Sequence, residues 1–369
     1  MNNPKYQPKL LQIIPTNGYG GAEEYCLTIG SAAKKNNWDV HVAFPKSEGT
    51  TQLIKKFSGQ GISYHPLAIT KAPKKHLGIL RSELPSFLRT LLLLQKIDPD
   101  IVTITLPFLD RGFASIMACA FLKKPTQVVF QLASKKIQMS IQKIKAYEWA
   151  RQQNQTWIAV SDQNRHIISE TFHCEVDEIE LIYNGVKISS DKTRNISSNL
   201  ARKKLREELN LPLDSRLLLT VGRLHPQKGH IDLIPAIPQL VKQFPDIYFL
   251  WAGEGELRQT LEQKAREYEI SERIIFLGYR SDIQKIYQAS DLFIFPSHFE
   301  GQPFSLMEAM SWGLPVVTTS VSGIPEIIND NIHGLLFEAG DSCDLLKKVQ
   351  FALNNPELLK KMSLEAKKQ

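Results

Sequence analysis

Short strand-like segments alternate with helix-length segments along the whole sequence, and this alternation constrains the fold more than any other feature. In the first half, the strand-like segments are rich in apolar or β-branched residues and cover residues 9–15, 39–44, 100–106, 127–132, 156–160 and 180–183. The second half repeats the pattern at residues 217–221, 247–252, 274–277, 292–295, 315–319 and 334–337. Because parallel strands need long crossover connections, the pattern predicts parallel sheets covered by helices.

Two series of strands indicate two domains. A chain of 369 residues is too long for one ordinary core. Residues 187–199 are polar and rich in Ser, Lys and Asp, and we interpret them as a linker. The sequence therefore predicts an α/β protein with two doubly wound Rossmann-like domains, residues 1–186 and 200–369. We expect the domains to face each other across a cleft between the carboxyl ends of their strands, where ligands usually bind.

Composition and spacing exclude several classes of protein. The apolar fraction of 43% excludes a disordered chain. No run reaches the roughly 18 apolar residues of a membrane span, and residues 1–11 lack the layout of a secretory signal. The four cysteines show no CxxC spacing and the nine histidines no HExxH spacing. We therefore expect a cytoplasmic protein without a disulfide framework or a metal site.

The net positive charge of the chain comes entirely from its first half. Residues 1–186 carry 22 Lys and Arg against 15 Asp and Glu, whereas residues 187–369 carry 23 of each. Such an excess suggests an anionic partner for the first half, which is membrane lipid, nucleic acid or a phosphorylated substrate. The alternative is a solvated surface that happens to be rich in lysine.

Two segments of the first half suit a membrane surface. Residues 134–151 place Ile137, Ile141 and Ile144 on one face of a predicted helix with lysines beside it, and residues 71–96 hold six basic groups. Apolar burial together with basic residues near an anionic leaflet suffices for peripheral attachment. The competing interpretation is an amphipathic helix that faces the core.

A glycine-rich segment, NGYGGAE over residues 17–23, lies between a predicted strand and a predicted helix. Its glycines, among them Gly20 and Gly21, let backbone N–H groups approach an anion, and the helix N-terminus adds a favourable dipole. The pattern is not GxGxxG, which disfavours a dinucleotide site of the dehydrogenase kind. A purely structural turn remains the alternative.

The second candidate segment, VGRLHPQKG over residues 221–229, follows a predicted strand. It holds Arg223 and Lys228 in one loop, and Gly222 allows close approach of a ligand. Arginine offers a planar fork and lysine a movable point charge, a pair suited to a diphosphate.

The third candidate segment, PSHFEGQPFSLMEAMSWG over residues 296–313, is the most specific. Glu300 lies in a loop and Glu308 on a helix predicted to begin near Phe304, so both carboxylates can face one pocket. Carboxylates accept hydrogen bonds from sugar hydroxyls, while helix N-terminal N–H groups hold phosphate. The alternative places Glu308 on the helix surface, but its apolar neighbours indicate that it faces inward.

These motifs resemble those of the group 1 glycosyltransferases, the retaining family-4 enzymes of GT-B architecture. In the second half the resemblance rests on VGRLHPQKG, WAGEGE (251–256), FLGYRSD (276–282), the segment from ASDLFIF to GLPVV, and SGIPEII (322–328). The first half is similar through YGGAE, IAVSDQNR (158–165) and IYNGV (182–186).

The resemblance implies roles for individual residues. Arg223 and Lys228 would bind the donor diphosphate, Glu308 the ribose hydroxyls, and Glu300 the donor sugar near the reacting face. The other implied donor contacts are Gly20 and Gly21 over the diphosphate, Gly222 in the Arg223 loop, Gly278 and Tyr279 beside the base, and Gln302, Phe304 and Ser305 at sugar and phosphate.

The resemblance also implies the reaction. A front-face displacement would move a hexose-type sugar from a nucleotide-diphosphate sugar with retention at the anomeric carbon, and cationic side chains and helix dipoles would stabilise the leaving diphosphate. No metal or cofactor is expected. The acceptor would be a saccharide or a lipid-linked molecule in polysaccharide or glycolipid biosynthesis, and the enzyme would be cytoplasmic or peripheral on the inner face of the membrane.

The first half departs from the family pattern. Many relatives carry a His where, counting from Pro125, this chain has Gln131, and Thr103 and Thr105 replace a His-x-His. A Gln amide can hydrogen-bond to donor hydroxyls but cannot act as a base near neutral pH. We expect Gln131 to take part in catalysis by positioning. The alternative is a degenerate relative that binds nucleotide sugar without transferring it.

Two further expectations concern the C-terminus and nucleic acid. The family's last helix usually crosses back onto the first domain, whereas this sequence ends at Gln369 directly after a basic helix, so we expect a truncated C-terminus. A nucleic-acid-binding protein is disfavoured, because the basic half lacks interleaved aromatic residues and any module signature.

Overall fold

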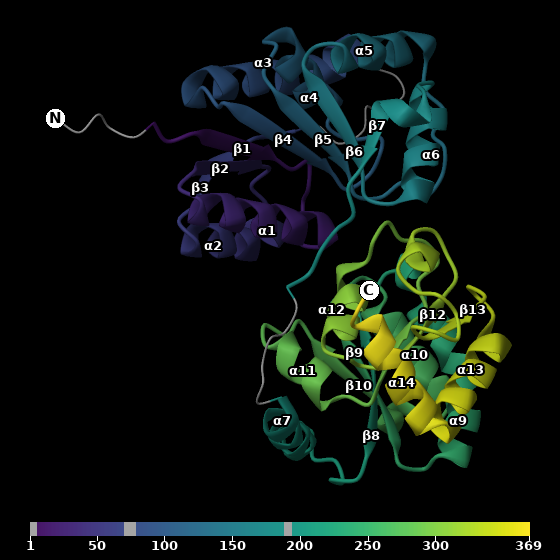
Figure 1. Cartoon of the computed structure of the whole chain (residues 1–369). Coiled ribbons are helices and arrows are strands. Elements are labelled where there is room, and N and C mark those ends of the chain that lie inside the picture. The colour runs from purple at the N-terminus through teal and green to yellow at the C-terminus, as the bar shows by residue number, and fades with distance from the viewer. Residues whose placement is uncertain (1–5, 70–78, 188–193) are drawn as a thin grey trace. The chain divides into compact units, whose positions relative to one another are not determined.

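The computed structural model describes residues 6–69, 79–187 and 194–369. It consists of two compact units, Met1–Asn184 (unit 1) and Gly185–Gln369 (unit 2). Each unit has its own parallel sheet with helices on both faces (Figure 1), which confirms the predicted fold class. Within the described residues, no helix has both the length and the apolar character of a membrane span.

The sheet of unit 1 has seven strands in the order β3-β2-β1-β4-β5-β6-β7, all paired in parallel. The strand pattern in the sequence predicts six of these strands and does not predict β3. The strands are β1 (Lys9–Ile13), β2 (Asp39–Phe44), β3 (Ser63–Pro66), β4 (Ile101–Leu106), β5 (Thr126–Phe130), β6 (Gln155–Ala159) and β7 (Ile179–Leu181).

Helices cover both faces of this sheet because the apolar residues of its strands point alternately to either side. In β1, Leu11 and Ile13 join the larger core cluster, whereas Leu10 packs in the cluster on the other face. The helices of unit 1 are α1 (Gly21–Lys35), α2 (Thr51–Gly59), α3 (Ile79–Ile97), α4 (Phe113–Phe121), α5 (Ile141–Arg151) and α6 (Asp162–Phe172).

Helix α5 corrects the prediction for residues 134–151. The helix begins only at Ile141, so Ile137 lies in the preceding coil, where it packs against the core. Ile144 is half-buried, and Ile141 alone of the three is exposed. The exposed apolar face that the sequence pattern predicts for membrane docking is therefore absent from this helix.

The sheet of unit 2 has six parallel strands in the order β10-β9-β8-β11-β12-β13. The strands are β8 (Arg216–Val221), β9 (Ile247–Ala252), β10 (Ile274–Gly278), β11 (Leu292–Phe295), β12 (Val316–Thr319) and β13 (Leu335–Phe337). The helices are α7 (Arg194–Glu208), α8 (His230–Leu233), α9 (Ile237–Gln243), α10 (Arg258–Glu267), α11 (Ile283–Ala289), α12 (Phe304–Ser311), α13 (Ser342–Asn354) and α14 (Pro356–Ala366).

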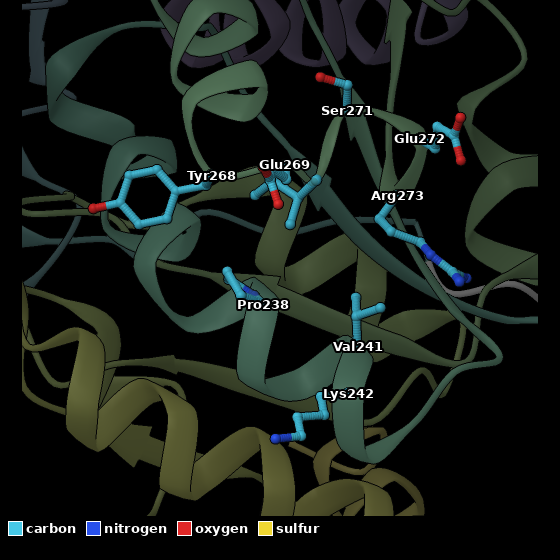
Figure 2. A pocket seen from close by; sticks show the side chains of 9 residues that line it. Pro238, Val241, Lys242, Tyr268, Glu269, Ser271, Glu272 and Arg273 are labelled. Carbon is cyan, nitrogen blue, oxygen red and sulfur yellow. The ribbon is translucent and has the colours of Figure 1, made fainter.

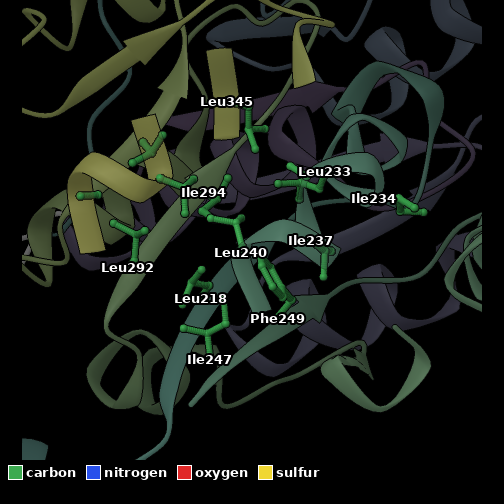
Figure 3. Close-up of a cluster of buried hydrophobic side chains, with 14 of the residues drawn as sticks. Leu218, Leu233, Ile234, Ile237, Leu240, Ile247, Phe249, Leu292, Ile294 and Leu345 are labelled. Atoms are coloured by element: carbon green, nitrogen blue, oxygen red, sulfur yellow. The ribbon is translucent and has the colours of Figure 1, made fainter. Parts of the chain in front are cut away.

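Alternation along β8 again builds two cores. Leu218 faces the cluster drawn in Figure 3, where strand residues such as Phe249 meet Leu233 and Leu240 of the covering helices. Leu217 and Leu219 pack in the cluster on the opposite face of the sheet. Together the two clusters fix the plane of the sheet and the position of the loops at the carboxyl ends of its strands.

Helix α7 begins at Arg194, inside the range predicted as linker, and residues 188–193 of that range lie outside the described residues. The helix is anchored to the sheet by Arg206, which is 2% exposed. Its guanidinium donates to Ser215 O and, at 2.9 Å, to Oδ2 of Asp291, the residue directly before β11. Because this buried guanidinium is hydrogen-bonded on several sides, it holds α7 on the sheet of unit 2.

Candidate functional site

Four loops follow the carboxyl ends of β8, β9, β10 and β11 in unit 2, and we call this side of the sheet its carboxyl edge. Close contacts of glycine backbones hold these loops against one another. Gly253, after β9, has φ +141°, and a Cβ there would lie 2.0 Å from Gly222 O after β8. Its N–H donates at 2.8 Å to the carbonyl oxygen of Gly278, the last residue of β10. A Cβ on Gly229, with φ +64°, would lie 1.9 Å from Pro296 O after β11. Only glycine allows these approaches.

Lys228 and Glu300 meet in the middle of this edge. Lys228 Nζ lies 2.5 Å from Glu300 Oε1, and the two side chains are only 16% and 7% exposed. The hydroxyl of Ser297 donates to the same Oε1 at 2.6 Å. Because both donors use Oε1, the second carboxylate oxygen, Oε2, receives no hydrogen bond from the described residues. The arrangement orients the carboxylate and leaves one oxygen for a ligand.

The β8 loop is braced against the β11 loop by Gln227, which is buried. Gln227 Nε2 donates to Phe299 O at 2.8 Å, and Gln227 O accepts from His298 N at the same distance. His298 Nε2 in turn lies 2.8 Å from Asp232 Oδ2 of α8. These bonds hold the loop that carries Lys228 next to the loop that carries Glu300.

Arg223 lies one residue after Gly222 and is exposed. Within the described residues its guanidinium makes no ion pair or hydrogen bond. Burial, with the positive charge of Arg223 second, lowers the pKa of His225. The guanidinium is therefore a cation at the edge of the sheet that is open to an anionic ligand.

Helix α12 presents Glu308 toward the interior. Tyr287, fully buried on α11, donates its hydroxyl to Glu308 Oε2 at 3.0 Å and to Ser305 O at 3.2 Å. Burial and the nearby carboxylate raise the pKa of Tyr287 well above its usual value. The helix begins at Phe304 as the sequence predicts. Its N-cap residue is a proline without a capping side chain, so the first N–H groups remain for an anion.

The remaining predicted residues of unit 2 lie at the same edge. Gln302 is buried beside α12, and Gly222 borders the Lys228 side chain, whose Cγ and Cδ would lie 3.4 Å from an added Cβ. Gly278 has φ +64°, and Tyr279 after it is 43% exposed. The structure thus brings the predicted residues of unit 2 to the ends of β8, β10 and β11.

Three predicted residues belong to unit 1. Gly20 is the N-cap of α1 and Gly21 its first residue. Gln131 follows β5 and is buried; its Oε1 accepts from Asn184 Nδ2 at 3.1 Å, and its Nε2 is without a partner in the described residues. Because Asn184 holds Oε1 of this amide, its Nε2 is oriented and can donate a hydrogen bond that positions a polar ligand.

The sequence patterns did not single out several residues that shape these sites. Ser297 is three residues before Glu300, and this local spacing could have indicated its contact with the carboxylate. Asn184 lies in the quoted IYNGV segment, but nothing in the sequence pairs it with Gln131. Tyr287 carries no local signal, because its partners on α12 are distant in sequence. Within the described residues there is no cluster of His, Cys, Asp and Glu that could hold a metal ion.

A cavity of about 520 Å³ lies on the opposite side of unit 2, near the amino ends of its strands. Figure 2 shows its lining by side chains from α9, such as Lys242, and from the segment before β10, such as Arg273. This segment precedes the amino end of a strand, whereas the predicted site residues follow carboxyl ends. None of the predicted site residues lines the cavity.

Family comparisons match both halves of the chain. Residues 201–369 match the family Glycosyl transferases group 1, and residues 19–190 match Glycosyltransferase Family 4. Among solved structures, the Anabaena protein Alr3699/HepE in complex with UDP and glucose superposes with a TM-score of 0.79 at 19% identity, covering 98% of this chain and 94% of that one. At 19% sequence identity, this superposition shows a shared fold alone.

Curated relatives match over part of their length. UDP-Gal:alpha-D-GlcNAc-diphosphoundecaprenol alpha-1,3-galactosyltransferase of Escherichia coli is 29% identical over 188 residues, which is 50% of this chain and 47% of the relative. A component of the phosphatidylinositol N-acetylglucosaminyltransferase of Homo sapiens is 35% identical over 149 residues, which is 39% of this chain and 31% of the relative. The chain thus matches about half the length of these relatives or less.

Proposed function

Because the chain belongs to the group 1 glycosyltransferases, we propose that it transfers a hexose-type sugar from a nucleotide-diphosphate sugar to a saccharide or lipid-linked acceptor. The observation that carries the proposal is the cluster at the carboxyl edge of unit 2. There Lys228, Glu300 and the open cation Arg223 lie on interlocked loops. Two cations and an oriented carboxylate suit the diphosphate and the sugar of such a donor.

Donor binding would rearrange the Lys228–Glu300 pair. A diphosphate carries more negative charge than one carboxylate, so it would draw the Lys228 ammonium toward itself. Arg223 would take the other phosphate oxygens through its guanidinium fork. Glu300, still held by Ser297, would then accept a hydroxyl of the donor sugar, and Glu308 would accept the ribose hydroxyls.

The other proposed donor contacts follow from their places on the loops. Gly278 and Tyr279 would flank the base. The segment from Gln302 to Ser305, including Phe304, would offer N–H groups to sugar and phosphate. From unit 1, Gly20 and Gly21 would supply N–H groups to the diphosphate.

The proposed chemistry is a front-face displacement with retention. Lys228, Arg223 and the N-terminal dipole of α12 would stabilise negative charge on the leaving diphosphate, which lowers the barrier to cleavage of the anomeric C–O bond. The departing phosphate oxygen would accept the proton of the acceptor hydroxyl. Gln131 would position a hydroxyl through its Nε2, and no step requires a metal.

The proposed setting is cell-surface polysaccharide or glycolipid biosynthesis at the cytoplasmic face of a membrane. The name of the E. coli relative includes a diphosphoundecaprenol acceptor, and that of the human relative includes phosphatidylinositol. A lipid-linked acceptor for this chain is in keeping with both names, and the net charge of +7 suits an anionic membrane as a partner.

One observation favours a second candidate, a relative that binds nucleotide sugar without transferring it. The resemblance to the family places Gln131 where many relatives carry His, and an amide cannot accept a proton near neutral pH. In the displacement proposed above the donor phosphate takes that proton, so loss of the base leaves transfer intact. We therefore retain the transferase as the proposed function.

The test is incubation with a panel of nucleotide sugars and candidate acceptors while released nucleoside diphosphate is measured. The transferase predicts acceptor-dependent release for one donor, with the product anomer matching the donor by NMR. Tight donor binding without release for any acceptor, together with release restored in Gln131→His, would establish the binding protein instead. Lys228→Ala should weaken donor binding, and Lys242→Ala, near the amino ends of the unit 2 strands, is its matched control.

A further inference from the structure

Helix α3 buries Leu94 and Ile97 in the core, as an ordinary surface helix does, but it also exposes a row of leucines. Its buried side includes the small polar residues Ser86 and Thr90, and Thr90 Oγ1 donates to Ser86 O at 2.8 Å. Its outer side carries Leu84, Leu88 and Leu92, which are 46%, 49% and 66% exposed. Surface helices normally bury large apolar side chains and expose polar ones. A row of exposed leucines at a spacing of four residues indicates a partner surface.

The exposed apolar residues continue onto the neighbouring helix α4, which lies beside α3 (Figure 1). Phe121, the last residue of α4, is 63% exposed. Its ring packs edge-on at 6.0 Å from that of Phe87 on α3. We call the set of Leu84, Leu88, Leu92 and Phe121 the α3–α4 surface.

Basic residues border this surface. Lys96 continues the row of leucines at the same spacing, Arg89 lies beside the row, and Lys123 follows α4; all three are exposed. None of them forms an ion pair with a described residue. The neighbouring acid Asp98 is already paired with Lys124 at 2.5 Å. The border of the α3–α4 surface is therefore positively charged.

The acidic residue within α3 faces elsewhere. Burial lowers the pKa of Lys143 on α5, and the carboxylate of Glu83 opposes that shift. Glu83 likewise raises the pKa of Tyr147 on α5, after the larger effect of burial. Its charge thus acts toward α5 and leaves the basic border uncompensated.

We propose that the α3–α4 surface docks on an anionic lipid bilayer. The leucines and Phe121 would enter the interface between headgroups and acyl chains, while Arg89, Lys96 and Lys123 would meet lipid phosphates. A second copy of the chain is a poorer partner, because a two-fold contact would bring the same basic groups together. The inference rests on the proposed function only in that a lipid-linked acceptor would be met at such a surface.

The test is co-sedimentation of the full chain with vesicles of phosphatidylcholine alone or mixed with phosphatidylglycerol. Glutamine keeps the helix propensity of leucine, so Leu88→Gln/Leu92→Gln alters the surface alone. We expect this variant to lower the partition coefficient on mixed vesicles at least about tenfold. Arg89→Gln/Lys96→Gln should lower it several-fold on mixed vesicles only. The matched control is Leu358→Gln/Leu364→Gln on α14, whose leucines are 39% and 55% exposed.

Equal binding of wild type and the α3 double variant would overturn the proposal. So would a concentration-dependent dimer in lipid-free solution that the same variant abolishes, since the partner would then be a second copy. Nucleoside diphosphate binding, measured by calorimetry without lipid, should be the same in wild type and all three variants. A variant that loses vesicle binding but keeps diphosphate binding shows that this surface is separate from the proposed donor site. If the protein binds no nucleoside diphosphate at all, the vesicle result still tests the docking surface.

Discussion

The two units share a topology but stabilise their loops differently. Both sheets begin in the same spatial order, with the third, second, first and fourth strands of each unit as neighbours. In unit 2, the loops at the carboxyl edge touch backbone to backbone, as at Gly253 and Gly229. In unit 1, one such contact joins the loops after β1 and β2, since a Cβ on Gly49 would lie 2.5 Å from Asn17 O, whereas a Cβ on Gly18 in the same glycine-rich loop would have no neighbour within 4 Å.

The difference indicates how each unit constrains its sequence. Backbone contacts admit only glycine, and the Lys228–Glu300 pair needs both partners, so the carboxyl edge of unit 2 tolerates little change. In unit 1, the contacts proposed for Gln131 and for the exposed leucines of α3 are made by side chains, which place no such restriction on the backbone.

Gly253→Ala should break the interlocked loops. Because φ is +141° and the new Cβ would lie 2.0 Å from Gly222 O, we expect the free energy of unfolding to fall by about 3 kcal/mol. The matched change in unit 1, Gly18→Ala, should leave it within about 0.5 kcal/mol of wild type. Chemical denaturation of both variants provides the measurement, and equal stabilities would refute the contrast between the two loops.

His230 gives unit 2 a specific sensitivity to acid. Burial, with Lys228 second, lowers its pKa from 6.5 to about 3. The unfolded chain takes up a proton on this residue below pH 6.5, and the folded chain does so only near pH 3. The stability contributed by neutral His230 is therefore complete above pH 6.5 and is lost as the pH falls toward 3.

His230→Leu should flatten the dependence of unfolding free energy on pH in that window, by up to about 1 kcal/mol per pH unit. His166→Gln in unit 1 is the control, since that side chain is 58% exposed. Denaturant titrations at a series of pH values measure both slopes. If His230→Leu retains the wild-type slope, the residue is charged in the folded state.

Ser297→Ala tests whether the oriented carboxylate matters to the reaction. Without the hydroxyl, Glu300 loses one of its two donors, so we expect kcat to fall about tenfold with a smaller change in the KM for the donor. Ser290→Ala is the control, because that buried hydroxyl, directly after α11, donates to Ile286 O of the same helix. Equal losses in the two variants would assign Ser297 a purely structural role.

Gln131→Ala should have the smallest effect of the series. We expect kcat to fall several-fold, by more than the affinity for the donor, because the amide would act most as the anomeric centre reacts. The pH profile should keep its shape, since a Gln amide does not titrate. A variant that lost donor affinity alone would show that Gln131 contributes only to binding.

Most of the fold could be predicted from the sequence because it depends on local patterns. The strands β8 to β13 are short apolar runs between clear breaks, and all six were predicted. Strand β3 was not, since its sequence SYHP has two polar residues and a proline, and it forms through pairing with β2 at the edge of the sheet. The start of α5 was placed too early, because Lys135, Lys136 and Ile137 before Ile141 imitate a helical period.

Residues of the candidate site could be predicted where side chains suited to binding a ligand stand in short motifs of characteristic spacing. Arg223, Lys228 and Glu300 stand in short motifs, and the structure brings the last two together. Tyr287 and Asn184 were missed because their contacts join segments far apart in the chain. The leucines of α3 were missed for another reason: the helix also has buried leucines such as Leu94, and only its packing in unit 1 shows which of its leucines point outward.

The most direct test of the account is titration calorimetry of nucleoside diphosphates against Arg223→Ala/Lys228→Ala. Charge-assisted bonds to phosphate contribute roughly 1.5–3 kcal/mol each, so the account predicts at least about tenfold weaker binding for either single change and more for both. Lys242→Ala/Arg273→Ala, on the opposite edge of unit 2, should bind as wild type does. Unchanged diphosphate affinity in a folded Arg223→Ala/Lys228→Ala protein would contradict the assignment of the donor site.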